Sequence, residues 1–192
     1  PSSYTVLELG AGRGWLGRDI LSHISPSFLK TFTYLHRDDS PAAQNEAQQV
    51  LAPWIQSGRA VVTDHLDSIQ PFVGAIFSNE LFDALPAQPW RWDGSKWLQE
   101  VLSSAGSEWH TADAAEAGQW FASQAEDLEA GDGSIWAEGL TPLVHLLAQK
   151  LTQGIMIAID YGESADRLLA KGADLRRYHQ HQVDGKWWED IG

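Results

Sequence analysis

Short apolar runs alternate with amphipathic stretches along most of the 192 residues. The apolar runs, which we interpret as strands, lie at 6–9, 32–35, 60–63, 73–77 and 155–159. Helical periodicity is found between them at 16–24, 41–51 and 143–151. Because strands that alternate with helices favour a parallel sheet, the expected fold is α/β, with a Rossmann-like sheet and helices on both faces.

Capping residues predict where two of the helices begin and end. Ser40 is suited to cap a helix that begins at Pro41, since proline tolerates the first helical turn. The later helix is expected to begin at Thr141-Pro142 and to end at Gly154. The runs that contain residues 73–77 and 155–159 are almost uninterrupted in apolar character, which is typical of strands covered on both faces.

A segment at 87–135 interrupts this alternation. Residues 90–101 predict a hairpin with a tight Asp93-Gly94 turn, followed by an edge strand at 109–111 and an acidic surface helix at 114–130. We therefore expect a single domain over 1–192, in which this segment is an insertion that covers the carboxyl edge of the sheet.

Composition excludes several classes of function. The net charge of −13 argues against non-specific binding of nucleic acid or of an anionic membrane surface. The absence of cysteine excludes disulfides, zinc sites built from thiolates and cysteine nucleophiles. No apolar run approaches the ~20 residues of a transmembrane helix, so no membrane insertion is expected. We identify no set of ligands for a metal.

A glycine-rich turn follows the first strand and carries the strongest local signal. Gly10, Gly12 and Gly14 allow a sharp turn and a close approach of a ligand to the backbone. The third glycine of the dinucleotide fingerprint is missing, and Glu8 would repel a pyrophosphate but attract a cationic amino group. S-adenosylmethionine carries such a group and no phosphate. The alternative is a tight strand-to-helix turn that binds nothing.

Acidic residues also follow the next two strands. Asp38 lies where Rossmann-like folds bind ribose hydroxyls, although an aspartate here also suits the start of the helix at Pro41. Asp64 follows the third strand and is a candidate for contact with an adenine amino group. The alternative for Asp64 is an ordinary turn aspartate.

Two further clusters follow the fourth and fifth strands. Glu80 and Asp83 are three residues apart, so on a helical turn they would share one face and form a paired-carboxylate site. Asp160 follows the fifth strand at the same edge of the sheet. The alternative for the first cluster is a solvated acidic turn that ends at Pro86.

These motifs resemble a known family. The pattern Glu8-x-Gly10-x-Gly12-x-Gly14 resembles motif I of class I S-adenosylmethionine-dependent methyltransferases. The stretch from Asn79 to Pro86 is a more specific signal. Together with residues 159–162 and 175–181, it is similar to the MidA family. That family includes a mitochondrial protein arginine methyltransferase that assists the assembly of respiratory complex I. The N-terminal segment of the family is either absent or lies outside these 192 residues, and Gly192 stands where threonine is usual.

The resemblance implies a class I methyltransferase sheet and a protein arginine methyltransferase that uses S-adenosylmethionine. The cofactor would be held by residues at the strand ends, namely Glu8, Gly10, Gly12, Gly14, Asp38, Asp64 and Asn79. Glu80 and Asp83 would orient a guanidinium, with Asp160 as a third carboxylate and His181 as a proton relay. His181 reads equally well as a polar residue of a late strand.

The resemblance also bears on partners and compartment. The substrate would be a protein, in the family a subunit of a respiratory complex, and the protein would be cytoplasmic in a bacterium or in the mitochondrial matrix in a eukaryote. Two other functions remain open: a degenerate fold that binds S-adenosylmethionine and acts in assembly, and a nucleotide-dependent oxidoreductase, against which the glycine spacing and Glu8 argue.

Overall fold

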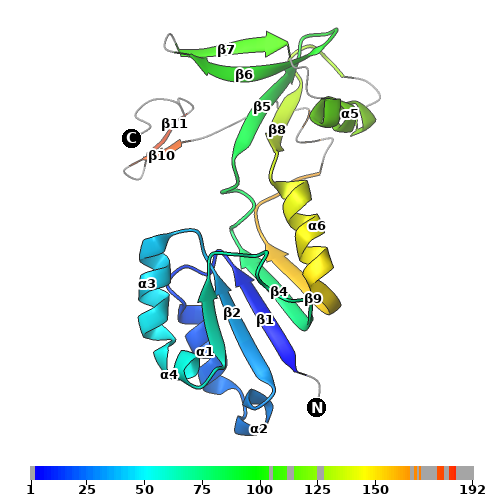
Figure 1. The fold of residues 1–192 in the computed structure, drawn as a ribbon. Coiled ribbons are helices and arrows are strands. Elements are labelled where there is room, and N and C mark those ends of the chain that lie inside the picture. Colours follow the sequence, from blue (N-terminus) through cyan, green and yellow to red (C-terminus); the bar gives the residue numbers. More distant parts are fainter. Residues whose placement is uncertain are drawn as a thin grey trace. The chain divides into compact units, whose positions relative to one another are not determined.

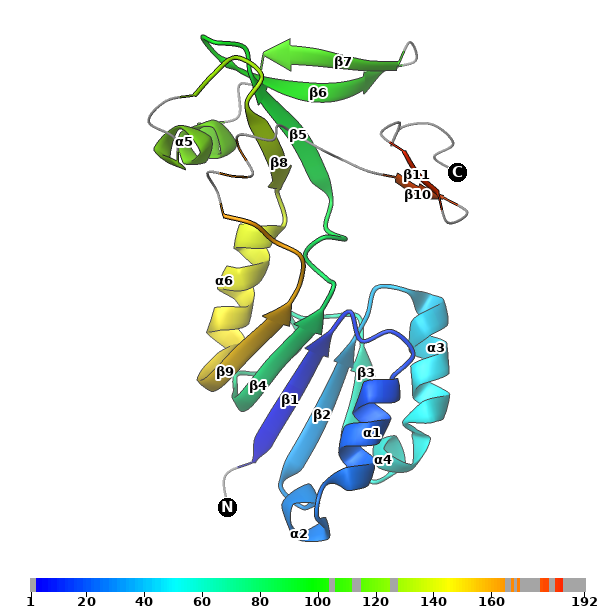
Figure 2. The same cartoon turned by 180° about the vertical axis from the view of Figure 1, so that it is seen from behind.

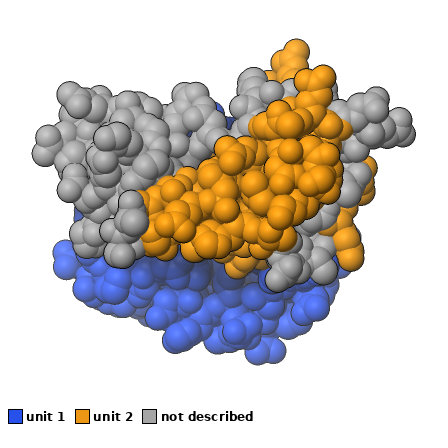
Figure 3. Space-filling view, turned by 90° about the horizontal axis from the view of Figure 1, so that it is seen from above, with its two compact units in different colours: residues 1–85, 140–161 blue, residues 86–139, 162–192 orange. Residues whose placement is uncertain are grey.

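The structure is a computed structural model, and it describes residues 3–103, 106–111, 115–124, 128–164, 167, 169, 177–179 and 182–184. The chain divides into two compact units, which are coloured separately in Figure 3. Unit 1 comprises residues 1–85 and 140–161, and unit 2 comprises residues 86–139 and 162–192. The predicted insertion at 87–135 falls within unit 2, and its position over the sheet stays a prediction.

The described residues of unit 1 form a parallel sheet in the order β3-β2-β1-β4-β9 (Figure 1). Its strands are β1 (Tyr4–Leu9), β2 (Phe32–Arg37), β3 (Ala60–Thr63), β4 (Phe72–Asn79) and β9 (Leu151–Ile159). All four pairings between neighbouring strands are parallel. The expected α/β fold is therefore confirmed.

Helices lie on both faces of this sheet (Figures 1 and 2). One face carries α1 (Trp15–His23), α3 (Pro41–Val50) and α4 (Ala52–Gln56), with α2 (Pro26–Leu29) beside the start of β2, and the other face carries α6 (Leu140–Lys150). The predicted start of α3 is confirmed, because the Ser40 hydroxyl accepts the N–H of Ala43 at 3.3 Å. Within the described residues, no helix combines the length and apolar character needed to cross a membrane.

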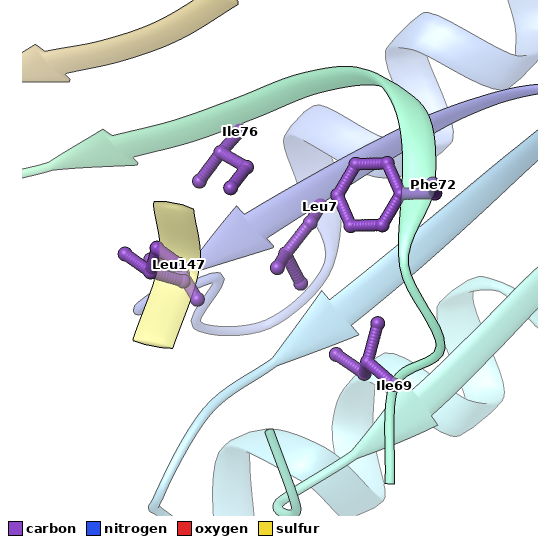
Figure 4. Packing of buried hydrophobic residues seen from close by; sticks show 6 residues of the cluster. Leu7, Ile69, Phe72, Ile76 and Leu147 are labelled. Atoms are coloured by element: carbon purple, nitrogen blue, oxygen red, sulfur yellow. The ribbon is translucent and has the colours of Figure 1, made fainter. Parts of the chain in front are cut away.

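The period-two alternation of β1 distributes its side chains between two cores. Leu7 and Leu9 point to the α6 side, where Leu7 packs with Ile76 and Leu147 (Figure 4). The intervening Glu8 points to the opposite side, where Tyr34 packs in the core formed with α1 and α3. This alternation places a carboxyl group inside the second core.

The boundary between α6 and β9 differs from the prediction. The helix ends at Lys150 rather than at Gly154, because β9 already pairs with β4 from Leu151 onward. Gly154 is a strand residue that lies opposite Gly74, and a Cβ on Gly154 would overlap the Gly74 carbonyl oxygen. Pairing with a distant strand therefore outweighed the local stop signal.

The prediction that the last strand is covered on both faces is wrong for β9. Ile155, Ile157 and Ile159 are 55%, 43% and 53% exposed. They lie on the same face of the sheet as α1 and α3, but those helices cover β1, β2 and β3 instead.

The described residues of unit 2 form an antiparallel sheet in the order β7-β6-β5-β8. Its strands are β5 (Ala87–Trp92), β6 (Trp97–Ser103), β7 (Gly106–Thr111) and β8 (Gly133–Ala137). The unit also contains α5 (Ala115–Gln124), β10 (Arg177–His179) and β11 (Gln182–Asp184). The predicted hairpin and edge strand are confirmed. The predicted helix at 114–130 is shorter, because residues 129–132 form a turn that leads into the unpredicted β8.

Candidate functional site

The strand register brings the predicted site segments to one edge of unit 1. Leu9 lies opposite Arg37 and Ser78, and Asn79 lies opposite Ile159. The residues that follow these positions therefore begin the loops at a shared carboxyl edge. In open parallel sheets this edge is where ligands bind.

The three glycines of the turn have left-handed backbones but different surroundings. Gly10, Gly12 and Gly14 have φ values of 62°, 54° and 79°. A Cβ on Gly14 would lie 3.1 Å from the Cβ of Ala47 in α3, so this glycine allows α1 and α3 to pack closely. A Cβ on Gly12 would have no neighbour within 4 Å among the described residues, so Gly12 is the glycine whose Cα faces open space.

Several N–H groups of the turn are used within the protein. The N–H of Ala11 donates to the Arg37 carbonyl at 3.1 Å, and the N–H of Gly14 donates to the Ala11 carbonyl at 3.2 Å. The N–H of Gly12 donates to Oδ2 of Asp38 at 2.8 Å. A turn that binds a pyrophosphate offers such groups to the phosphate oxygens, whereas here they face inward and one already meets a carboxylate.

Glu8 lies buried beneath the turn. It is 7% exposed, and its Oε2 accepts a hydrogen bond from the Tyr34 hydroxyl. Burial raises the pKa of Glu8, the Tyr34 hydrogen bond lowers it, and the nearby Asp38 carboxylate raises it further, with a net increase. Burial and the Glu8 carboxylate also raise the pKa of Tyr34. A cation at the turn would stabilise the ionised form of Glu8.

The loop after β4 is anchored to the end of β9. Glu80 has φ 49°, an uncommon conformation for a residue with a side chain, and its N–H donates to the Ile159 carbonyl at 2.8 Å. Oδ2 of Asp160 accepts the N–H of Phe82 at 2.7 Å, while its Oδ1 accepts the N–H of Tyr161 at 2.8 Å. Asp160 therefore holds the loop that carries Glu80.

The same loop also contacts the glycine turn. A Cβ on Gly10 would lie 3.2 Å from Cδ1 of Leu81, so the Leu81 side chain packs against the turn. Residues 81–85 form two successive turns, closed by hydrogen bonds of 3.2 and 3.3 Å, rather than the helical turn considered from the sequence. Glu80 and Asp83 are both exposed on this loop.

The remaining predicted residues are less closely tied to this edge. Asp64 is exposed, and its Oδ1 lies 3.2 Å from Nε2 of the adjacent His65. Asn79 is exposed at the end of β4, and His181 lies outside the described residues. A hollow of about 530 Å³ lies near the starts of the strands, beside Thr5, Phe72 and Thr152 among others, and includes none of the predicted site residues.

Sequence reasoning missed two residues of β2 that contact the turn and the strand before it, Tyr34 and His36. Tyr34 and His36 alternate on the buried face of β2, and His36 lies opposite Glu8 in the register. A Cβ on Gly17 would overlap the Tyr34 ring, so α1 needs a glycine where it crosses this strand. The signal that could have revealed them is the alternation Phe32, Tyr34, His36, read against that of β1.

Comparison with known proteins places the chain in a family. A family model described as "Putative S-adenosyl-L-methionine-dependent methyltransferase" matches residues 1–192. The chain belongs to this family. Its expected cofactor, S-adenosylmethionine, is thereby confirmed, and the turn fits it. A Cβ on Gly12 would meet no described residue within 4 Å, the N–H groups of Ala11, Gly12 and Gly14 are used within the protein, and Glu8 and Asp38 supply negative charge.

Solved structures support the same fold. A protein from Burkholderia thailandensis that was crystallised with S-adenosyl-homocysteine is similar over 95% of this chain, with 22% identity and a TM-score of 0.76. A native crystal structure of a protein of the same superfamily from that organism has 23% identity, the same coverage and a TM-score of 0.75. The chain spans about half the length of these structures, 49% and 50%. A search of curated proteins found no significant match.

Proposed function

We propose that this chain binds S-adenosylmethionine at the glycine turn and that the protein transfers the methyl group to an arginine of a protein substrate. The observation that carries the first part is the turn itself. Gly12 presents an open Cα, while its N–H is occupied by Asp38 and a second carboxylate, Glu8, lies beneath. This arrangement favours a cationic nucleoside without phosphate over a dinucleotide.

Asp38 and Glu8 have separate roles in this proposal. Asp38 already accepts N–H groups from Gly12 and Ser40, one on each oxygen, and the remaining lone pairs of both oxygens are suited to ribose hydroxyls. Tyr34 engages Oε2 of Glu8, so Oε1 is the oxygen proposed to accept the cofactor ammonium. Asn79 and Asp64 stay predicted contacts at the same edge.

The exposed carboxylates of the loop after β4 support the choice of acceptor. A carboxylate accepts the forked N–H donors of a guanidinium in two-point geometry, and Glu80 and Asp83 lie on a loop that packs against the turn through Leu81. When bound, S-adenosylmethionine supplies a methyl group activated by its sulfonium. Glu80 and Asp83 orient the guanidinium nitrogen and receive or relay the proton that it loses.

The identity of the protein substrate rests on the MidA resemblance. The stretch from Asn79 to Pro86 and the residues around Asp160 are the motifs that support it. On this basis we propose a subunit of a respiratory complex as the substrate. Asp160 acts in this proposal by holding the loop at the Phe82 N–H, and not by direct contact with the acceptor.

Two measurements on the full-length protein test this function. Calorimetry with S-adenosylhomocysteine should show binding, and labelled S-adenosylmethionine should transfer methyl groups to arginine in a protein substrate. Glu80→Gln should leave the cofactor affinity within threefold of wild type and reduce transfer at least tenfold. Binding without transfer to arginine would refute the acceptor and favour a binding module, whereas no binding would refute both parts of the proposal.

A further inference from the structure

His36 is a fully buried histidine that contacts the backbone of the glycine turn. It is 0% exposed and lies in β2, two residues before Asp38. Its Nε2 lies 2.8 Å from the carbonyl oxygen of Gly12. Because a carbonyl oxygen only accepts hydrogen bonds, Nε2 must carry a proton and donate it to this oxygen.

Gly12 is therefore held on both sides by side chains from the end of β2. Asp38 accepts the Gly12 N–H at 2.8 Å, and His36 donates to the Gly12 carbonyl at 2.8 Å. Glycine has the largest backbone freedom of any residue, so a free turn would sample many conformations. These two contacts select one of them, with φ 54° and the Cα facing open space.

We propose that His36 is a positioning residue that sets the cofactor affinity of the turn by holding the Gly12 carbonyl inward. This inference rests on the proposed binding of S-adenosylmethionine at Gly12. A residue that is 0% exposed acts through the backbone that it holds and not by contact with the ligand. Loss of the donor at Nε2 lets the Gly12 peptide rotate, so that ligand binding must restore its order.

A matched pair of substitutions separates the hydrogen bond from the space that the ring fills. His36→Gln places an amide N–H close to the position of Nε2, whereas His36→Met has a similar size and shape but no donor. We expect His36→Gln to bind S-adenosylhomocysteine within threefold of wild type and His36→Met to bind it at least tenfold more weakly. His23→Gln is the control, because His23 is exposed and its Nδ1 contacts the Asp19 carbonyl within α1.

The free energy of unfolding of each variant, measured with denaturant in the absence of ligand, tests whether the role of His36 is only structural. If both His36 variants lose stability while their affinity equals that of wild type, the inference is refuted and the proposed function stands. If wild-type protein does not bind S-adenosylhomocysteine, the proposed function fails and this inference fails with it. Nitrogen NMR of wild type gives a check that needs no variant: Nε2 of His36 must carry a slowly exchanging proton, and its absence overturns the inference.

Discussion

Replacing Glu8 by glutamine should change stability and cofactor affinity in opposite directions. The burial that raises the pKa of Glu8 means that its ionised form destabilises the ligand-free protein at neutral pH. Glutamine keeps the size and still accepts the Tyr34 hydroxyl, but it carries no charge. Glu8→Gln should therefore raise the free energy of unfolding, by about 1.4 kcal/mol for each pH unit by which the folded-state pKa of Glu8 lies above its ordinary value.

The same substitution should weaken cofactor binding. A hydrogen bond to a charged group contributes about 1.5–3 kcal/mol, which corresponds to a roughly 10- to 150-fold increase in the Kd of S-adenosylhomocysteine. Calorimetry measures this loss, and urea unfolding measures the gain in stability. A structural glutamate would show a loss of stability with unchanged affinity, and that result would refute the assignment of Glu8 to the cofactor.

The pH dependence gives the sign of the Glu8 effect independently. Because the folded-state pKa lies above the ordinary value of 4.5, the contribution of Glu8 to stability is fully present below pH 4.5 and is lost as the pH rises through the raised pKa. The stability advantage of Glu8→Gln should therefore grow with pH across that window and then become constant. An advantage that is independent of pH would show that the charge of Glu8 is not its cause.

Three further substitutions test other parts of the site. Gly12→Val should abolish binding of S-adenosylhomocysteine and lower the free energy of unfolding by ~1–2 kcal/mol, because valine is strained at a positive φ. Gly58→Val is the control, since Gly58 has φ 69° and a Cβ there would have no neighbour within 4 Å among the described residues. It should cost the same ~1–2 kcal/mol of stability and leave binding unchanged. Glu80→Gly should raise the free energy of unfolding by about 1 kcal/mol through relief of its left-handed backbone and should reduce methyl transfer. Asp160→Asn should weaken the hydrogen bond that Asp160 accepts from the Phe82 N–H, lower the rate of methyl transfer and leave the cofactor Kd unchanged. An increase in that Kd would show that Asp160 acts on the cofactor instead.

The sequence predicted best those features that local pattern determines. The alternation of apolar runs and amphipathic stretches predicted the parallel sheet, and Ser40-Pro41 predicted the start of α3. The end of α6 and the existence of β8 were missed because each depends on pairing with a strand far away in the sequence. Local propensity carries little information about such pairings.

The same distinction applies to the candidate site. Sequence reasoning located the residues at the strand ends, but not the side chains that support them from below. The contact between His36 and Gly12 joins residues 24 positions apart, and that between Tyr34 and Glu8 joins residues 26 apart. Both contacts depend on the register of β1 with β2, which places Glu8 opposite His36 and cannot be read from either strand alone.

A crystal structure of the full-length protein with S-adenosylhomocysteine would show directly whether the glycine turn binds the cofactor. We expect the nucleoside to lie against the bare Cα of Gly12, with its ribose hydroxyls on Asp38 and its ammonium directed at Glu8. A ligand bound elsewhere with the turn empty, or a turn that instead takes up the pyrophosphate of a dinucleotide, would contradict this expectation.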